Sequence, residues 1–385
     1  MRVSGSKVKS YDIVTMDVLF IETFYGGSHK SFADQWIAHS SHNYHLQTLP
    51  PRFWKWRQAG SALFLSESIP RPEEKKFDAV MVSGMIDLGQ LKAFRPDLPP
   101  AMLYIHENQF AYPLQAGEQR DFRYGLTDLA NILSAETAVF NSFFNRDTFF
   151  EECRSLFRRL PDAIPRNAVE KALGKSEVIY PGIDIRAISR EPPNSSEKNK
   201  VPLIIWNHRH EHDKNPETAF RVLKKLSRRK IPFRLALLGE RFEKSPPAFD
   251  MARRELTEHI VVDDFPGRED YYRWLRRGDI VISTAIQENF GLSVIEAAAA
   301  GCRPLLPRRL AYPEVLPLWA QWACLWDNEQ ELEEKIEKLL GQTEEQRKSL
   351  NRPLSRWMEK YGWESQAGKL DSMLEKTAAT PRREL

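Results

Sequence analysis

Short apolar runs alternate with longer amphipathic stretches along the first half of the chain. The apolar runs predict buried strands at residues 17–22, 77–83, 102–105, 137–140 and 178–180. An amphipathic helix is expected from about Ser31, after the first strand and the turn that follows it. Apolar strands joined by helices are typical of a parallel sheet that is covered on both faces. The pattern therefore predicts a doubly wound α/β domain over residues 1–190.

The same alternation starts again after a polar segment. Residues 188–200 are polar, contain two adjacent prolines and show no periodicity, so we place a linker at 191–200. The second series predicts strands at 202–206, 233–238, 260–262 and 279–283, and helices at 216–229, within 248–258 and at 269–277. It predicts a second Rossmann-like domain at 201–355. We expect the tail at 356–385, with the region of Trp357 and Trp363, to pack back on the first domain as a helix.

Length and composition agree with two folded domains. A chain of 385 residues usually divides into two domains, and 42% apolar with 11% aromatic residues excludes wholesale disorder. No apolar run approaches the ~18 residues that span a bilayer, so we expect no stable membrane insertion. The three cysteines form no CxxC pair, and residues 1–10 lack an apolar signal core. These features predict a cytoplasmic protein.

The charge of the chain is nearly balanced. With 56 basic and 53 acidic residues, the net charge of +3 is too small to indicate a nucleic-acid partner by itself. Local basic clusters could face phosphates, although most such runs are solvated surface: 158–159, 224–230, 276–277 and 308–309. The run Phe53-Trp-Lys-Trp-Arg57 interleaves aromatic and basic residues, as surfaces that stack bases do. A helix that packs two tryptophans explains this run equally well.

The clearest candidate for a ligand site lies at residues 279–304. An apolar strand leads into a loop with Glu288, and the loop feeds a helix of small residues that starts near Gly291 and Leu292. Free N–H groups and the helix dipole at such a start suit a diphosphate. Glu296 follows about one helical turn later, so its carboxylate can reach ligand hydroxyls. The pattern indicates a site for a sugar diphosphate; the alternative is an ordinary strand-loop-helix unit with two solvated glutamates.

A polar segment also directly follows the first strand of the second domain, where open α/β sheets bind ligands. Arg209 and Lys214 are candidates for holding a diphosphate, because cations there stabilise the charge that builds on a leaving nucleoside diphosphate. The alternative is an exposed polar loop. His208, His210 and His212 alternate in this segment. We do not expect a zinc site, since charged residues separate the histidines and no cysteine accompanies them.

Polar residues follow two strands of the first domain as well. Gly26 and Gly27 leave the first strand without side chains, which lets a ligand approach the backbone closely. His106 follows the strand at 102–105 and could hydrogen-bond the donor sugar. The next three residues could position acceptor hydroxyls: Glu107, Asn108 and Gln109. The alternatives are a glycine turn needed for geometry alone and a histidine with a structural role.

Several of these motifs resemble known glycosyltransferases. The Asn289-Phe290-Gly291 turn with its two glutamates, the Arg209 and Lys214 pair and the run Tyr180-Pro-Gly-Ile-Asp184 resemble retaining GT-B enzymes such as glycogen and sucrose-phosphate synthases. More specific runs are similar to the tRNA-queuosine α-mannosyltransferases: Ile21-Glu-Thr-Phe-Tyr-Gly-Gly-Ser-His-Lys30, His106-Glu-Asn-Gln-Phe-Ala-Tyr-Pro113, Phe140-Asn-Ser-Phe-Phe-Asn145 and His208-Arg-His-Glu-His-Asp-Lys-Asn-Pro216. Together the matches extend from Asp17 to about Pro313.

The resemblance implies a GT-B fold, with two Rossmann-like parallel-sheet domains that face each other across a cleft. It implies transfer of mannose with retention from GDP-mannose, without cofactor or bound metal, to the cyclopentenediol of queuosine in the anticodon of tRNA-Asp. In that picture Arg209 and Lys214 hold the diphosphate and Glu296 binds the ribose. Glu288 holds the mannose and, with His106, Arg209 and Lys214, completes the catalytic set. The other donor contacts are Gly26, Gly27, Asn207, Asn289, Phe290, Gly291 and Leu292. The acceptor contacts are His29, Glu107, Asn108 and Gln109.

Two other functions stay open at this point. One is a GT-B glycosyltransferase with a lipid-linked or small-molecule acceptor, docked on a membrane by an amphipathic face. Four phenylalanines could belong to such a face, although a place in the core suits them better: Phe143, Phe144, Phe149 and Phe150. The other is a non-catalytic RNA-binding protein on the same scaffold. The presence of the two glutamates and the two cations argues against it.

Overall fold

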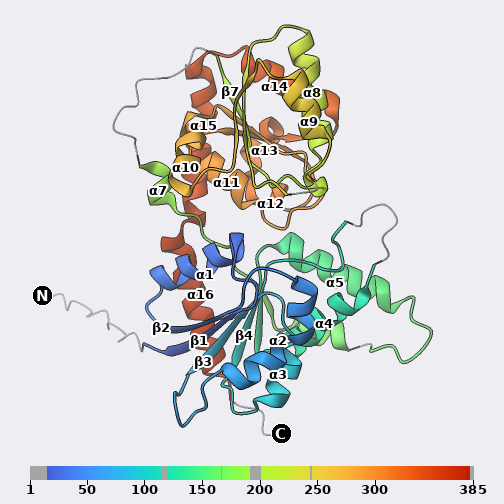
Figure 1. Ribbon diagram of the computed structural model, residues 1–385, viewed down its shortest axis with the longest axis vertical. Helices are drawn as coiled ribbons and strands as arrows, with labels where there is room; N and C mark the ends of the chain where they lie inside the picture. Colours follow the sequence, from blue (N-terminus) through green and yellow to red (C-terminus); the bar gives the residue numbers. More distant parts are fainter. Residues whose placement is uncertain (1–14, 114–119, 166, 191–200, 243–244, 382–385) are drawn as a thin grey trace, which may run out of the picture.

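The chain folds around two parallel sheets of six strands each (Figure 1). The structure, a computed structural model, describes residues 15–113, 120–165, 167–190, 201–242 and 245–381. The linker expected at 191–200 lies outside the described residues. In Figure 1 one sheet lies in the lower part of the molecule and the other in the upper part, each covered by helices.

The first sheet has the strand order β2-β1-β3-β4-β5-β6. Its strands are β1 (Asp17–Glu22), β2 (Asn43–Thr48), β3 (Ala79–Ser83), β4 (Ala101–Ile105), β5 (Thr137–Phe140) and β6 (Ser176–Val178). The helices that connect them are α1 (Gly27–His39), α2 (Trp54–Ser68), α3 (Leu88–Phe94), α4 (Phe122–Ser134), α5 (Phe143–Phe157) and α6 (Ala168–Leu173). The strand order reverses between β1 and β3, and ligands of such sheets bind at that point, beyond the carboxyl ends of the strands.

The second sheet has the order β12-β11-β10-β7-β8-β9. Its strands are β7 (Leu203–Trp206), β8 (Arg234–Leu238), β9 (Ile260–Asp264), β10 (Ile280–Ile282), β11 (Arg303–Pro307) and β12 (Leu325–Trp326). Its helices are α8 (Pro216–Arg228), α9 (Ala248–Glu255), α10 (Arg268–Arg277), α11 (Leu292–Ala299), α12 (Tyr312–Val315), α13 (Leu318–Cys324), α14 (Glu329–Leu340) and α15 (Glu344–Met358). Here the order reverses between β7 and β10, so the loops after these two strands meet.

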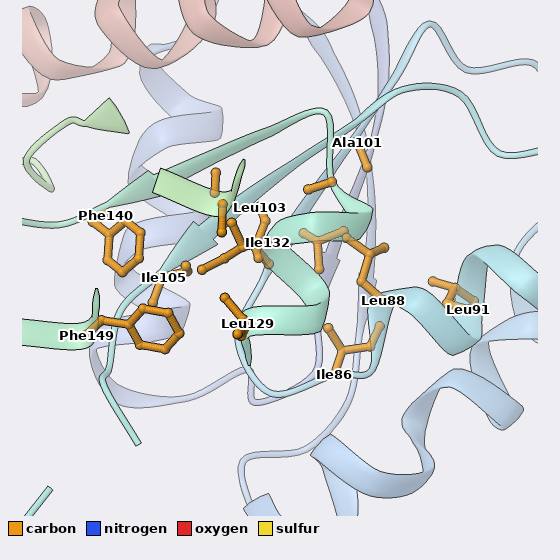
Figure 2. Packing of buried hydrophobic residues seen from close by; sticks show 14 of the residues in the cluster. Ile86, Leu88, Leu91, Ala101, Leu103, Ile105, Leu129, Ile132, Phe140 and Phe149 are labelled. Carbon is orange, nitrogen blue, oxygen red and sulfur yellow. The ribbon is translucent and has the colours of Figure 1, made fainter. Parts of the chain in front are cut away.

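Buried side chains of the strands form a separate core on each face of each sheet. Figure 2 shows one of these cores, in which Leu103 and Ile105 of β4 meet Leu129 and Ile132 of α4, with Phe149 of α5 beside them. Full burial of such a side chain contributes about 1.5–3 kcal/mol to folding. These layers hold the carboxyl ends of the strands at fixed positions, and those ends carry the candidate site.

The last helix, α16 (Trp363–Ala378), returns to the first domain. It lies beside α1 in Figure 1, and Trp363 and Leu370 are buried in the same cluster as Phe20 of β1. Trp357 does not take part in this packing. It belongs to α15 in the second domain, where its indole nitrogen donates to the carbonyl of Val315 (3.3 Å). The turn between α15 and α16 is therefore where the chain crosses back to the first domain.

Asp371 anchors α16 to the first domain. Its buried carboxylate accepts hydrogen bonds from the Trp36 indole (2.8 Å), the Ser40 hydroxyl (2.8 Å) and the Ser41 amide (3.1 Å). Asp371→Ala leaves these donors without partners, so we expect it to lower the free energy of unfolding by about 2–4 kcal/mol. Urea unfolding checks this value. The exposed Lys376→Ala on the same helix is the control, and a loss no larger than in this control would contradict the anchoring role.

The observed elements differ from the predicted ones mainly where the polarity pattern is weak. Strand β2 is not predicted, because its residues are half-buried at the edge of the sheet and mix polar with apolar types. Strand β11 is not predicted either, since Pro304 interrupts the strand signal. Helix α1 begins at Gly27 rather than near Ser31, and β6 ends at Val178 rather than beginning there.

Candidate active site

The site in the second domain is built from the loops that follow β7 and β10. Lys214 lies between them with only 8% of its surface exposed. Its Nζ donates to the carbonyl of Gln287 (2.8 Å) and lies 3.0 Å from an Asp213 oxygen and 3.5 Å from Glu288 Oε2. Burial lowers the pKa of Lys214, but the charges of Glu288 and Asp213 outweigh burial and raise it. The ammonium is therefore a fixed positive charge at this loop.

Glu288 and Gly291 define the start of α11. Glu288 Oε1 accepts a hydrogen bond from the Gly291 amide (3.1 Å). Gly291 has a φ of 94°, a left-handed conformation that favours glycine, and a Cβ here would lie 3.1 Å from the ring of Tyr312. The loop thus turns sharply and leaves the N-terminus of α11 beside the Lys214 ammonium.

Glu296 lies on the first turns of α11 and faces α10. Its two carboxylate oxygens accept hydrogen bonds from the hydroxyls of Tyr271 and Tyr272, each at 3.2 Å. Burial raises the pKa of Glu296, while the charge of Arg268 and the two phenols act in the opposite direction. Tyr271 also accepts from the amide of Asn207 (3.0 Å), which links Glu296 to the loop after β7. Hydrogen bonds therefore hold the Glu296 carboxylate in place beside the loops that follow β7 and β10, called the donor loops below.

Arg209 lies at the outer side of the same loop. Its side chain is 49% exposed and pairs with Glu211 (2.9 Å). Burial lowers the pKa of Arg209, but the carboxylates around it, first Glu211 and then Glu107 of the first domain, raise it overall. The Arg209 charge therefore lies on the side that faces Glu107 of the first domain, whereas the Lys214 charge is buried within the second domain.

Four side chains meet where the strand order of the first sheet reverses. Glu22 ends β1 and Ser83 ends β3, and the Ser83 hydroxyl donates to Glu22 Oε2 (2.7 Å). The same carboxylate lies 3.1 Å from His29 Nδ1, and Ser83 lies 2.8 Å from His106 Nε2. Because the Ser83 proton is directed to Glu22, the His106 Nε2–H donates to Ser83 and Nδ1 of His106 is left as an acceptor.

The two histidines of this cluster differ in charge. Burial lowers the pKa of His29, but the charge and hydrogen bond of Glu22 outweigh burial and raise it. Burial lowers the pKa of His106 far below its usual range, and the nearby His29 lowers it further. The cluster therefore pairs a histidine that favours the charged form with one that is neutral at physiological pH.

The ligand atoms of Glu22, His29 and His106 lie within 4.8 Å of one another, a spacing that a divalent cation can bridge. Each of these atoms already has a hydrogen-bond partner, His29 directly on Glu22 and His106 on Ser83, so the cluster does not require an ion. His208 and His210 are not part of any such group among the described residues. Burial lowers the pKa of His208 to about 3 and that of His210 to about 4, and His210 stacks on Phe249 at 3.7 Å.

The two halves of the site touch each other. The Asn289 side-chain amide donates to the carbonyl of His106 (3.3 Å), and the Ser142 hydroxyl donates to the carbonyl of Asn289 (2.5 Å). Glu314 of the second domain caps α5 by accepting from the amides of Phe143 (2.8 Å) and Phe144 (2.9 Å). The loop that Lys214 contacts and the loop with His106 therefore meet where the two domains touch.

Comparison with known proteins extends this picture. Residues 17–183 match the family described as tRNA-queuosine alpha-mannosyltransferase N-terminal, and residues 188–352 match glycosyl transferases group 1. A tRNA-queuosine alpha-mannosyltransferase of Drosophila melanogaster is 34% identical over 310 residues, which cover 78% of this chain and 81% of the relative. The chain belongs to the tRNA-queuosine alpha-mannosyltransferase family.

Solved structures show the same fold at low identity. Sucrose-phosphate synthase from Thermosynechococcus elongatus superposes with a TM-score of 0.72 at 12% identity, covering 94% of this chain and 98% of that one. A glycosyltransferase from Rickettsia africae gives a TM-score of 0.68 at 14% identity, covering 96% and 100%. The predicted GT-B fold is confirmed for this queuosine mannosyltransferase family member.

The structure places most residues that the sequence singled out on segments that follow the carboxyl ends of strands. Most of the donor set lies after β7 and β10, with Phe290 buried against Tyr180 and Tyr361, whereas Gly26 and Gly27 follow β1 in the first domain. Asn108 has no free amide group to offer an acceptor. Its buried Oδ1 accepts from the backbone amides of Phe110 and Ala111, and its Nδ2 donates to the Thr148 hydroxyl.

The glycines after β1 serve different purposes. A Cβ on Gly26 would lie 2.4 Å from Pro51, so its missing side chain makes room for protein. Gly27 has a φ of 52° and nothing within 4 Å of an added Cβ, so its backbone is open to a ligand. The sequence predicts that a ligand can approach the backbone closely at both glycines, but the structure leaves room for this at Gly27 only.

Several side chains that shape the site are missing from the sequence-based prediction: Glu22, Ser83, Asp213, Tyr271, Tyr272 and Glu314. Glu22 and Ser83 carry a recognisable signal, since each is a polar residue at the carboxyl end of an apolar strand. The two tyrosines and Glu314 carry none, because their partners lie on other elements far away in the sequence.

Proposed function

We propose that this chain transfers mannose with retention from GDP-mannose to the cyclopentenediol of queuosine in tRNA-Asp. Family membership supports the reaction class. The structural observation that supports it most is the hydrogen bond from Asn289 to the carbonyl of His106. It joins the loop after β10 in the second domain to the loop after β4 in the first domain.

The donor half follows from the fixed charges. Lys214 and Arg209 hold the diphosphate, with the N-terminus of α11 as a further set of donors. As the bond between the anomeric carbon and the diphosphate breaks, negative charge builds on the leaving oxygen. Preorganised cations stabilise that charge more than they stabilise the ground state. They supply the positive charge at the leaving group, so the proposal includes no metal or cofactor.

The acceptor half follows from the histidine cluster. The acceptor hydroxyl attacks the anomeric carbon from the face that the diphosphate leaves, and its proton passes to the leaving phosphate oxygen. Neutral His106 accepts a hydrogen bond from a mannose hydroxyl at Nδ1. Glu288 holds the sugar in this scheme and forms no covalent bond to it, because the acceptor hydroxyl attacks the anomeric carbon directly.

The α2 segment supports RNA as the partner. Helix α2 starts at the carboxyl edge of the first sheet, the same edge that carries His106. Phe53 and Trp56 are 72% and 61% exposed, which suits stacking on unpaired bases. Trp54 instead packs on Tyr124 at 4.9 Å, with Lys55 over both rings. The location expected from the sequence, the cytoplasm, is part of this proposal.

A membrane-docked enzyme finds less support. No described helix is both long and apolar enough to cross a bilayer. Phe149 and Phe150 are buried in the core of the first domain, and Phe144 is only partly exposed. Phe143 is the one member of that group with a largely exposed ring, and Arg146 covers it. The four side chains therefore do not form an apolar face.

The test is incubation of the purified chain with radiolabelled GDP-mannose and tRNA from cells that contain or lack queuosine, followed by nucleoside analysis. We expect label only in a queuosine-dependent nucleoside. Transfer to neither tRNA, with GDP-mannose still binding in a titration, would assign the acceptor to another class of molecule. Absence of both binding and transfer would favour a non-catalytic RNA-binding protein.

Glu296→Gln tests the donor-binding role of that carboxylate. The amide keeps the shape of the side chain but loses the charge that strengthens hydrogen bonds to ribose hydroxyls. We expect the KM for GDP-mannose to rise about tenfold, with turnover changed much less. Initial rates against donor concentration measure both values. Glu269→Gln, an exposed carboxylate on α10, is the control, and an unchanged KM in Glu296→Gln would refute the ribose contact.

A further inference from the structure

A small pocket opens in the first domain beside the histidine cluster. Its volume of about 30 Å³ gives room for about two water-sized groups. Its polar lining comes from α2, α4 and the loop after β4: Gln58, Asp128, Glu107 and Gln109, together with His29 and His106. The pocket thus adjoins the two histidines that the proposed reaction uses.

Gln58 lines this pocket and, within the described part of the chain, has an acceptor without a partner. Its side chain is 3% exposed, and its Nε2 donates to the carbonyl of Tyr124 (3.1 Å) and to Asp128 Oδ1 (2.8 Å). Both partners are acceptors, so the amide nitrogen must face them, and this fixes the orientation of the amide. Gln58 Oε1 is then buried without a hydrogen-bond partner among the described residues. A buried orphan acceptor of this kind costs free energy until a donor reaches it.

The two carboxylates of the pocket also form no ion pair with any residue that the structure describes. Among the described residues, neither Asp128 nor Glu107 lies within ion-pair distance of a lysine, arginine or histidine. Burial raises the pKa of Asp128 well above its usual range, and the charge of Glu107 raises it further. A bound cation supplies the missing counter-charge and favours the ionised carboxylate. The pocket is therefore rich in acceptors, and its cationic lining residue, His29, is engaged by Glu22 rather than by Asp128.

A protonated amine meets all of these requirements, because it brings a positive charge and two or three N–H donors. Queuosine carries such a group, since a secondary amine joins its cyclopentenediol to the base. We propose that Gln58 and Asp128 bind this secondary ammonium of the acceptor and so direct the neighbouring diol toward His106. The source of the amine rests on the proposed function, whereas the preference for a cationic amine rests on the pocket itself.

Asp128→Asn tests the site in the full chain. The amide keeps the shape of Asp128 but loses the charge, and we expect the KM for queuosine-containing tRNA to rise about tenfold or more. The KM for GDP-mannose and its slow hydrolysis should stay within about twofold of wild type. Glu67→Gln removes the same charge from an exposed position on α2 and serves as the control. A tRNA KM no higher in Asp128→Asn than in this control would overturn the proposal.

A small probe separates this proposal from the identity of the acceptor. The N-methylamine of the cyclopentenediol is titrated calorimetrically into the chain saturated with GDP, and its methyl ether, which lacks the cationic nitrogen, is the comparison. We expect wild type to bind the amine at least about tenfold more tightly than the ether, and Asp128→Asn to lose this preference. Equal binding of the two by wild type would refute the amine site. Selective amine binding without any transfer to queuosine tRNA would keep the pocket and refute the proposed function.

Proton release offers a readout that a structural role of Asp128 would not produce. Burial and Glu107 raise the pKa of Asp128, whereas a bound ammonium favours its ionised form, so we expect amine binding to release a proton from this group. The calorimetric heat of amine binding should then depend on the ionisation enthalpy of the buffer for wild type and not for Asp128→Asn. The same buffer dependence in both proteins would place the released proton on another group and contradict the assignment of Asp128.

Discussion

Lys214→Ala is expected to lower the turnover of mannose transfer by about 10²-fold or more, the loss typical of removing one preorganised charge from a developing anion. The buried ammonium is held by the carbonyl of Gln287 and lies between the carboxylates of Asp213 and Glu288. Its removal leaves these two carboxylates facing the diphosphate, so donor binding should weaken as well. Single-turnover rates at saturating GDP-mannose measure the loss in the chemical step.

Two further variants make the result interpretable. Lys214→Met keeps the volume of the side chain without its charge, so it should lose turnover as strongly as the alanine variant. Lys225→Ala removes a partly exposed cation from α8 and should leave turnover unchanged. Thermal unfolding of each variant separates loss of folding from loss of catalysis. A folded Lys214→Met with nearly normal turnover would exclude Lys214 from diphosphate stabilisation.

Glu22→Gln is expected to reduce turnover by roughly 10- to 10²-fold, although Glu22 need not touch either substrate. Glu22 acts as a positioning residue. It bonds His29 directly and orients His106 through Ser83. The glutamine can still accept from the Phe24 amide, which Glu22 binds at 2.7 Å, so the local backbone should hold.

The pH profile identifies this role. In wild type, burial lowers the pKa of His29 but Glu22 raises it above 6.5, so His29 stays protonated to higher pH than an isolated histidine. Without the carboxylate the pKa of His29 falls. Any limb of the rate profile that reports His29 should therefore move to lower pH in Glu22→Gln. Ser83→Ala removes the hydrogen bonds of Ser83 to Glu22 and His106 but keeps the Glu22 carboxylate beside His29, so it should lower the rate without moving that limb. A limb at the same pH in wild type and Glu22→Gln would contradict the pairing.

The donor loops are accessible to sequence reasoning because their signals are local. Glu288, Gly291 and Glu296 lie within one strand-loop-helix unit, and Arg209 and Lys214 lie just after one strand. Parallel sheets place all such loops at the same edge, so even the meeting of the two loops follows from a predicted parallel order. The acceptor side is less accessible. Glu22 and Ser83 are 61 residues apart, and they meet only because β1 and β3 are neighbours in the sheet.

Burial decides several roles that residue type leaves open. His106, His208 and His210 look alike in the sequence, yet only His106 joins the cleft network, while the other two are neutral histidines packed beneath the donor loop. Asn108 looks like an acceptor contact until its amide is seen to be used by its own loop. Whether a histidine is charged, or an amide is free to bind a ligand, depends on the residues around it in space. The local sequence does not specify those residues.

The sequence by itself determined the family, the doubly wound α/β domains and the donor loops, since strand periodicity, turn residues and motifs act over a few neighbouring residues. Only the tertiary structure decided which cations are buried, how Glu22 links the two histidines, and that Gln58 keeps an acceptor unpaired among the described residues, in a pocket beside Asp128. These features depend on strand order and helix packing. Both bring together residues that are distant in the chain, and the resulting loss of water sets their charge and hydrogen bonding.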